Sequence, residues 1–142
     1  MYRIKIFTIG RTKESWLEEA LSEYTQRLKN TLSIEWLLAK DDEGLQRLLE
    51  KEQSLICLDP KGEQMSSEAF SKWLVHSFLE NKSRLTFVIG GADGIPAHIK
   101  ARAKAQISFS LLTFTHQLTR LILLEQIYRG LEIARGGPYH RL

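Results

Sequence analysis

Strand-like and helix-like patterns alternate along the whole chain, and this alternation restricts the possible folds more than any other feature. Short apolar runs predict strands, whereas apolar residues three or four positions apart predict helices. Strands separated by helices indicate an α/β fold with a mainly parallel sheet flanked by helices. The predicted strands are 2–9, 34–38, 54–58, 85–89 and 107–110, and the predicted helices are 15–29, one within 41–52, one from Ser66 or Ser67 to about 79, 97–104 and 116–134.

Local signals refine some of these elements. Ser15 and Glu18 fit a capping box, so the first helix is expected to begin there. The run 59–62, Asp-Pro-Lys-Gly, favours a reversal of the chain and predicts a turn after the strand 54–58. Helical spacing places Trp16 and Leu79 on the apolar faces of their helices.

The helix 116–134 has apolar residues on more than one stripe of its surface. A helix on the surface of a domain needs only one apolar face. The wider apolar surface therefore predicts a second contact, which is either deeper burial within the chain or a subunit interface.

A chain of 142 residues, 43% of them hydrophobic, is expected to form one compact domain over residues 1–142 without a disulfide or a metal. The lone Cys57 lies in an apolar strand and is predicted to be buried. A reducing cytoplasm is the expected compartment. We expect no signal peptide and no membrane span, because no segment has the long apolar stretch that either requires.

Charge is distributed unevenly along the sequence. Residues 1–83 carry 12 Lys/Arg and 14 Asp/Glu, whereas residues 84–142 carry 8 and 3. A basic excess in one half suggests a polyanionic partner such as RNA. Ordinary solvated surface charge explains the same counts equally well.

A glycine-rich turn follows the apolar strand 85–89, with Gly90, Gly91 and Gly94. Ligands of parallel sheets bind beyond the carboxyl ends of the strands, which is where this turn lies. The pattern G-G-x-x-G is neither a dinucleotide fingerprint nor a phosphate loop, so a pyrophosphate site is not expected. A tight turn without a ligand remains the alternative.

The segment 109–116, Phe-Ser-Leu-Leu-Thr-Phe-Thr-His, combines apolar residues with hydroxyls after a strand. Its backbone could hydrogen-bond the edge of an adenine while Leu111, Leu112 and Phe114 cover the ring. A buried connection between strand and helix is the other interpretation.

The last residues also have an unusual composition. Tyr139, His140 and Arg141 follow a Gly-Gly-Pro hinge that ends the long helix. Pro138 stiffens the segment, and exposing the aromatic ring and the His is unfavourable unless they dock. The alternative is a frayed terminus.

The remaining histidines have weaker signals. His76 and His98 are expected at surface or capping positions, and His116 begins the long helix, where it either caps the helix or contacts a substrate. The sequence has no G-x-S-x-G, no H-E-x-x-H, no zinc-ligand spacing and no obvious catalytic carboxylate pair. We therefore expect no metal site.

Several of these segments together resemble the RlmH (YbeA-like) methyltransferases of the SPOUT superfamily. The similarity is dense over the last 60 or so residues and looser, though collinear, before them, where the Ile-Gly-x-x-Lys opening and 58–62 also fit. The matching segments are Phe87-Val88-Ile89-Gly90-Gly91-x-x-Gly94, Ser108-Phe109-Ser110-x-x-Thr113-Phe114-x-His116-Gln117-x-x-Arg120, Glu125-Gln126-x-Tyr128-Arg129 and Pro138-Tyr139-His140-Arg141.

The resemblance implies a SPOUT fold with a deep C-terminal trefoil knot, which is an exception to the rule against threaded chains. It also implies an obligate homodimer and S-adenosyl-L-methionine bound in the knot, with methylation of N3 of a pseudouridine in the RNA of the large ribosomal subunit, free or in the assembled ribosome. The implied cofactor-binding residues are Leu58, Gly90, Gly91, Phe109, Ser110, Leu111, Leu112, Thr113 and Phe114.

The resemblance further implies that four residues face the target base, namely His116, Arg129, Tyr139 and His140, with the tail of one subunit completing the site of the other. Basic side chains would stabilise the anion that develops when N3 loses its proton. His140 is the first candidate to accept that proton, with Tyr139 aligning its ring, and solvent is the alternative.

Two features depart from the family pattern. Thr115 stands where the family usually has Pro, which predicts a less rigid loop before His116, and the segment between Leu38 and Ser54 is shorter than usual. Two other functions remain compatible with the sequence: a SPOUT methyltransferase for another RNA, and a catalytically silent module that binds ribosomes.

Overall fold

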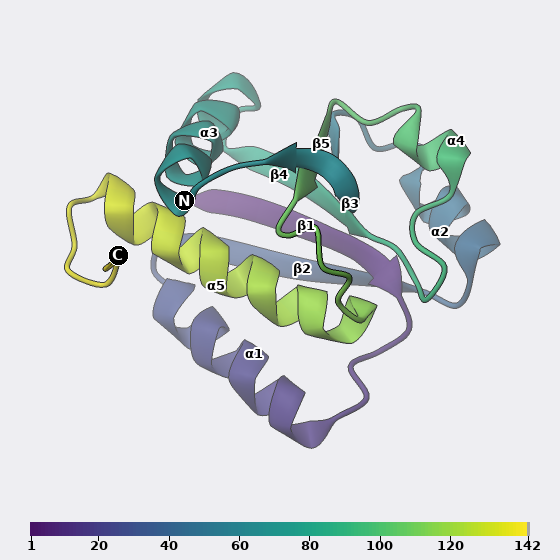
Figure 1. The fold of residues 1–142 in the computed structure, drawn as a ribbon, viewed down its shortest axis with the longest axis horizontal. Helices are drawn as coiled ribbons and strands as arrows, with labels where there is room; N and C mark the ends of the chain where they lie inside the picture. Colours follow the sequence, from purple (N-terminus) through teal and green to yellow (C-terminus); the bar gives the residue numbers. More distant parts are fainter. Residues whose placement is uncertain (142) are drawn as a thin grey trace.

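The computed structural model describes residues 1–141, so Leu142, the end of the predicted tail, lies outside it. Strands and helices alternate throughout the described chain (Figure 1). The elements are β1 Tyr2–Ile9, α1 Ser15–Leu28, β2 Leu32–Ala39, α2 Asp42–Leu49, β3 Leu55–Gln64, α3 Ser67–Glu80, β4 Arg84–Ile89, α4 Ala97–Lys100, β5 Ala105–Ser108 and α5 His116–Ala134.

The five strands form one sheet in the order β2-β1-β4-β3-β5, and every neighbouring pair is parallel. This confirms the predicted α/β fold with a parallel sheet flanked by helices. Because all strands point the same way, their carboxyl ends meet at one edge, where β4 leads into the glycine turn and β5 into the segment 109–115.

Helices cover both faces of the sheet, and each face has its own hydrophobic core. Side chains alternate across the strands, so Phe87 joins one core and Val88 the other. The larger core contains residues of α1, α3 and α5, and the smaller one contains residues of α2 and α4. Cys57 is fully buried in the smaller core, as predicted.

Helix α5 lies between α1 and α3 against the sheet (Figure 1). Its residues Leu123, Leu124 and Ile127 are completely buried, and Gly130 allows the backbone of α5 to approach Ser71 of α3. The Ser71 hydroxyl donates to the Gly130 carbonyl at 2.5 Å. Deeper burial within the chain therefore accounts for the wide apolar surface predicted for this helix, at least over these residues.

The predicted capping box at Ser15 is wrong. Ser15 is the first helical residue, the N-cap is Glu14, and within residues 1–141 the Glu14 side chain makes no capping hydrogen bond. Of the two candidates for α3, Ser66 is the cap, and its hydroxyl accepts from the Ala69 amide at 3.1 Å.

The predicted turn at 59–62 is also wrong, because β3 continues to Gln64. The strand shifts its register after Leu58 and then pairs again with β5, so the Pro and Gly of this run lie in an irregularity of a strand instead of a reversal. A Cβ on Gly62 would lie 2.6 Å from the carbonyl carbon of Gln106, so the glycine permits close approach of two backbones. Pairing with a strand more than 40 residues away overrides the local turn signal.

Helical spacing misplaced two large side chains. Trp16, in the first turn of α1, is 56% exposed, and Leu79, near the end of α3, is 78% exposed. Helical spacing shows which residues share one face of a helix. It does not show which residues near the ends of that face lie beyond the sheet and are exposed. Helix α4 is shorter than predicted and β5 begins earlier, because the Lys104 amide already donates to the Leu55 carbonyl of β3 at 2.8 Å.

None of the helices in the described part of the chain is both long and apolar enough to cross a bilayer.

Candidate functional site

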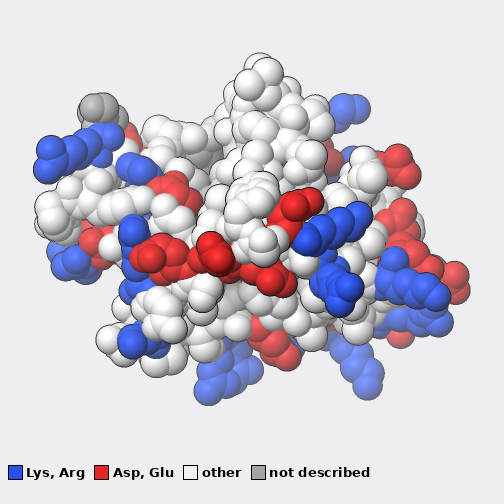
Figure 2. Space-filling view, turned by 90° about the horizontal axis from the view of Figure 1, so that it is seen from below, with Lys and Arg blue, Asp and Glu red and all other residues white. Residues whose placement is uncertain are grey.

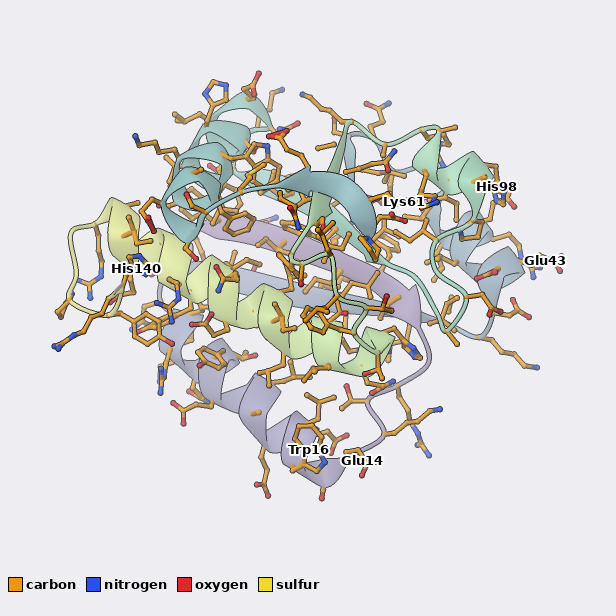
Figure 3. All side chains as sticks on the ribbon, viewed as in Figure 1. Glu14, Trp16, Glu43, Lys61, His98 and His140 are labelled. Atoms are coloured by element: carbon orange, nitrogen blue, oxygen red, sulfur yellow. The ribbon has the colours of Figure 1, made fainter. Side chains whose placement is uncertain are left out.

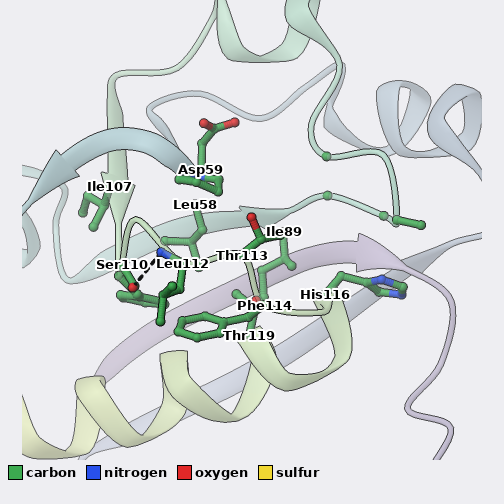
Figure 4. Close-up of a pocket in the computed structure, with 16 residues that line it drawn as sticks. Leu58, Asp59, Ile89, Ile107, Ser110, Leu112, Thr113, Phe114, His116 and Thr119 are labelled. Atoms are coloured by element: carbon green, nitrogen blue, oxygen red, sulfur yellow. Dashed lines mark hydrogen bonds between the residues drawn. The ribbon is translucent and has the colours of Figure 1, made fainter.

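A pocket opens at the carboxyl edge of the sheet, where β4 and β5 end and where β3 shifts its register (Figure 4). Its walls come from the middle of β3, the turn after β4, the segment after β5 and the first turn of α5. The lining residues include Leu58, Asp59, Gly90, Gly91, Gly94, Phe109, Ser110, Leu112, Thr113, Phe114 and His116. The predicted cofactor residues thus meet in one place, except Leu111, which does not line the pocket in the structure described.

The glycine turn forms one wall of this pocket. The Gly94 amide donates to the Gly91 carbonyl at 3.0 Å, and Gly94 has a φ of +83°. A Cβ on Gly90 would lie 2.4 Å from the Gly94 carbonyl carbon, so no larger residue fits without moving backbone. The turn is therefore tight, as the interpretation without a ligand predicted. It also lines the pocket, as the ligand-binding interpretation predicted.

The opposite wall is the segment 109–115. The Ser110 hydroxyl accepts from the Leu112 amide at 2.9 Å, and the Ser108 hydroxyl donates to the Ser110 carbonyl at 2.9 Å, so serines fix the shape of the loop. Leu111 and Leu112 are 79% and 72% exposed. Both leucines present apolar surface to solvent, although Leu112 also lines the pocket and Leu111 does not.

Thr115 caps α5, because its hydroxyl accepts from the Leu118 amide at 3.1 Å. Its φ of −61° is a value that proline also adopts, and the hydroxyl adds a hydrogen bond that proline lacks. The predicted loosening before His116 is thus offset by the cap. Because Thr115 is the cap, His116 does not cap this helix. Of the two roles predicted for His116, only the contact with a substrate remains as a hypothesis.

His116 lines the pocket from the first residue of α5. Burial lowers the pKa of its imidazole, and the positive charges of Arg120 and Lys13 lower it further. The ring is therefore neutral at pH 7 and can accept or donate a hydrogen bond at the pocket.

Arg120 is 1% exposed and anchors the loop that follows β1. Its guanidinium donates to the carbonyls of Ile9 at 2.9 Å and Gly10 at 2.7 Å and to the Thr12 hydroxyl at 3.1 Å. Its Nε has no hydrogen-bond partner in the described residues, and burial lowers the pKa of the guanidinium. No role was predicted for this residue, because the sequence pattern does not distinguish it from a surface Arg.

Gln117 fixes the same loop from the next position of α5. Its side-chain carbonyl accepts from the Lys13 amide at 3.1 Å, and its amide donates to the Arg11 carbonyl at 3.1 Å. The exposed side chains of Arg11 and Lys13 are thereby held on a loop anchored to the first turns of α5, next to the pocket.

The tail folds back on the other end of α5, where Figure 3 labels His140. It forms a second group, the tail cluster of Glu68, Glu125, Arg129, Tyr139 and His140. Arg129 Nη2 donates to Glu125 at 2.9 Å, and its guanidinium lies 4.8 Å from the centre of the Tyr139 ring. The Tyr139 hydroxyl donates to Glu125 at 2.8 Å. The described part of the tail is docked, so the frayed alternative is wrong.

Aromatic neighbours complete the docking of Tyr139. Its ring packs edge-on against Tyr128 with centroids 4.7 Å apart, and the Tyr24 hydroxyl lies 3.4 Å from its own hydroxyl. Burial, followed by the hydrogen bonds to Tyr24 and Glu125, raises the pKa of Tyr139. The phenol therefore stays protonated at physiological pH and acts as a donor.

The pocket and the tail cluster lie at opposite ends of α5. His116 begins this helix and Arg129 lies in its second half, so at 1.5 Å of rise per residue the two are about 20 Å apart along the axis. Of the four residues predicted to face the target base, the chain brings Arg129, Tyr139 and His140 together and leaves His116 at the pocket.

The other histidines are on the surface as predicted. His98 is exposed, and His76 pairs with Glu80 on the exposed side of α3 at 3.1 Å. No group of three or more potential metal ligands occurs within residues 1–141.

Charge on the face that carries α1 is mixed (Figure 2). Acidic side chains cross the middle of this face, and Lys and Arg lie mostly toward its rims. Helix α1 contributes the exposed Glu18, Glu19 and Glu23. The basic excess of the second half of the sequence therefore does not form one patch on this side of the molecule.

Comparisons with known proteins agree with the fold and with the sequence resemblance. The family described as "Predicted SPOUT methyltransferase" matches residues 2–140. Ribosomal RNA large subunit methyltransferase H of Protochlamydia amoebophila is 50% identical over 99% of this chain and 100% of its own length. The protein of the same name from Geotalea daltonii is 39% identical over 97% of this chain and 99% of its own.

Two solved structures have a similar fold. A probable methylase family protein from Haemophilus influenzae aligns with a TM-score of 0.61 over 98% of this chain and 70% of its own, at 8% identity. The SpoU methyltransferase AviRb from Streptomyces viridochromogenes, solved with AdoMet, aligns with a TM-score of 0.52 over 94% of this chain and 58% of its own, at 9% identity.

Proposed function

We propose, from the premise that the chain belongs to the SPOUT methyltransferase family, that it transfers a methyl group from S-adenosylmethionine to N3 of a pseudouridine in the RNA of the large ribosomal subunit. The substrate would be the free subunit or the assembled ribosome, in the cytoplasm. The pocket at the carboxyl edge of the sheet is the observation that carries the proposal. The names of the relatives support the RNA substrate, and the AdoMet in the AviRb structure supports the cofactor.

The residues of the pocket fit this methyl donor. Gly90 permits the tight turn that forms one wall of the pocket, because a Cβ there would lie 2.4 Å from the Gly94 carbonyl carbon. The backbone of 109–114 offers amides and carbonyls to an adenine, and the half-buried Phe114 provides an apolar contact. Leu58 closes the pocket from β3. The donor supplies an activated methyl group on a sulfonium, whose positive charge suits a wall of carbonyl dipoles.

A homodimer would join the two ends of α5 into one site. If two copies pair about a twofold axis near the middle of this helix, the tail cluster of one lies beside the pocket of its partner. Such a contact would cover Leu111 and Leu112, the two exposed leucines of the segment 109–115. We also propose that the segments around the pocket form a trefoil knot, as in the family that the sequence resembles.

Methylation at N3 requires that nitrogen to lose its proton and to approach the methyl carbon in line. Holding the two reactants in that geometry supplies much of the rate. Arg129 is suited to stabilise the negative charge that develops on the pyrimidine carbonyls. His116, which is neutral at the pocket, would contact the base by a hydrogen bond instead of a charge.

Transfer of a radiolabelled methyl group tests this function. The acceptors are large subunits, assembled ribosomes, and ribosomes from cells that lack the pseudouridine modification. We expect label in the RNA of one or both of the first two and none in the third. Label in ribosomes without pseudouridine would exclude the proposed target base, and no label in any of them would overturn the function.

A further inference from the structure

Both ring nitrogens of His140 have partners in the tail cluster. Nδ1 lies 2.9 Å from Arg129 Nη1, and Nε2 lies 2.8 Å from Oε1 of Glu68. A guanidinium can only donate a hydrogen bond, and an ionised carboxylate can only accept one. Nδ1 must therefore be the acceptor from Arg129, and Nε2 must carry the hydrogen that is donated to Glu68.

This pairing fixes the tautomer of the imidazole and limits its chemistry. The only lone pair of the neutral ring is on Nδ1, and the Arg129 guanidinium occupies it. A proton added to Nδ1 would face an N–H of Arg129, which is unfavourable. His140 is therefore poorly placed to accept a proton from a substrate while Arg129 stays in position.

The other contacts of Arg129 show which group the cluster holds in place. Glu125 accepts from Nη2 at 2.9 Å and from Nε at 3.2 Å, and the Tyr139 ring stacks on the guanidinium. His140 accepts from Nη1. The guanidinium is thus held through all three of its nitrogens and through one face, and the side chain is still 23% exposed.

We propose that Glu68 and His140 are positioning residues for Arg129. Glu68 holds His140 in the Nε2–H tautomer, His140 presents Nδ1 to Arg129, and Arg129 directs its remaining N–H groups at the negative charge that develops on the target base. This inference rests on the proposed function for the last step only, since the first two concern the protein alone. Glu68 lies in the first turn of α3, 72 residues from His140, and none of the sequence motifs includes it.

Nitrogen-15 NMR of the imidazoles in the full-length protein at neutral pH tests the tautomer without any RNA. We expect His140 to show a protonated Nε2 and an unprotonated Nδ1. In Glu68→Ala the ring loses its anchor at Nε2, so we expect it to turn away from Arg129 and to become a mixture of tautomers. Glu80→Ala is the matched control, because Glu80 pairs with His76 on the same helix and should leave His140 unchanged. A protonated Nδ1 in the wild type, or no response to Glu68→Ala, would overturn the proposal.

Substitution of His140 separates positioning from proton transfer. In His140→Asn the side-chain oxygen is bonded to Cγ, as Nδ1 is, and can accept from Arg129, but it cannot act as a base near neutral pH. We expect His140→Asn to keep single-turnover transfer within about tenfold of wild type, whereas His140→Ala loses about 100-fold because Arg129 is displaced. Equal loss in both variants would support a base and refute the positioning role.

The two experiments also separate this inference from the proposed function. If the wild type transfers no methyl group to any ribosomal acceptor, the proposed function fails, while the NMR result still decides whether Glu68 sets the tautomer. If the wild type is active and the Glu68→Ala variant transfers at the wild-type rate, the positioning role fails and the function stands.

Discussion

The two ends of α5 are built in different ways. At the first end, Arg120 and Gln117 bind mostly backbone atoms of the loop after β1, and the neighbouring pocket is lined by the glycine turn and by residues that are mostly uncharged. At the second end, Arg129 and the tail meet through charged and aromatic side chains. Contacts to backbone atoms and a tight glycine turn depend on space and on loop shape, whereas the tail cluster depends on the identity of each side chain. Substitutions should therefore act differently at the two ends.

Removing the residues from Tyr139 onward should have the largest effect on methyl transfer. It should disturb the tail cluster and leave the pocket at the first end of α5 intact. We expect methyl transfer to fall below detection, since Arg129 loses both its stacking ring and His140, while binding of S-adenosylmethionine remains measurable by calorimetry. Full transfer activity in the truncated protein would show that the tail has no part in the reaction.

Arg120→Met should destabilise the fold, because it removes the side chain that anchors the loop after β1 at the first end of α5. The carbonyls of Ile9 and Gly10 and the Thr12 hydroxyl lose their donor inside the protein, so we expect a loss of about 2–4 kcal/mol in the free energy of unfolding. Urea denaturation measures it. Arg47→Met, which removes an exposed pair with Glu43 at 3.7 Å, is the control and should cost at most about 1 kcal/mol. Equal costs would mean that Arg120 does not anchor the loop.

Gly90→Ala and Gly91→Ala test the glycine turn that forms one wall of the pocket. The new Cβ at 90 meets backbone of Gly94 at 2.4 Å, whereas at 91 it meets only the end of the Ile9 side chain at 3.2 Å. We expect Gly90→Ala to destabilise the protein by about 1–3 kcal/mol and to weaken S-adenosylmethionine binding, with a smaller effect of Gly91→Ala. Thermal unfolding and calorimetry measure the two effects, and the reverse order would contradict this account of the turn.

Tyr139→Phe should have a moderate effect at the second end. The ring remains stacked on Arg129, but the hydrogen bond to Glu125 is lost. A neutral donor to a charged acceptor contributes about 1.5–3 kcal/mol at most, so we expect transfer to fall by about tenfold with unchanged S-adenosylmethionine binding. A loss as large as that of the truncation would indicate that the hydroxyl itself takes part in the reaction.

The smallest effect should come from titration of His116. The pKa of this His is lowered from 6.5 by burial and by Arg120 and Lys13, so the unfolded chain binds its proton at a higher pH than the folded chain does. The contribution of His116 to stability is therefore lost as the pH falls below about 6.5. Stability measured between pH 7.5 and 5.5 should decrease less in His116→Gln than in wild type. Parallel curves would mean that the imidazole is not affected by its site.

Much of the first end could be predicted from the sequence. The strand 85–89, its glycines and the segment 109–116 are local patterns, and parallel strands must bring their carboxyl ends to one edge. The pocket followed from that geometry. What sequence patterns could not supply is the register shift in β3, because it depends on where β5 pairs with it.

The second end was only partly predictable. Tyr139 and His140 stand out beside a glycine hinge, so their docking was expected, but Glu68 is an ordinary acidic residue in the first turn of a helix. Arg120 is likewise indistinguishable in pattern from a surface Arg until the loop after β1 covers it. Hydrogen bonds between residues that are 72 or 110 positions apart produce no periodic pattern in the sequence, so they could not be predicted from it.

The sequence by itself determined the alternation of strands and helices, the buried position of Cys57 and the place of the glycine turn, since each follows from contacts within a few residues or from a regular hydrophobic period. Only the tertiary structure decided that α5 separates the pocket from the tail cluster, and that Glu68, His140 and Arg129 form one chain of hydrogen bonds. These arrangements depend on how α3, α5 and the tail pack together, and packing between distant segments is set by the whole fold.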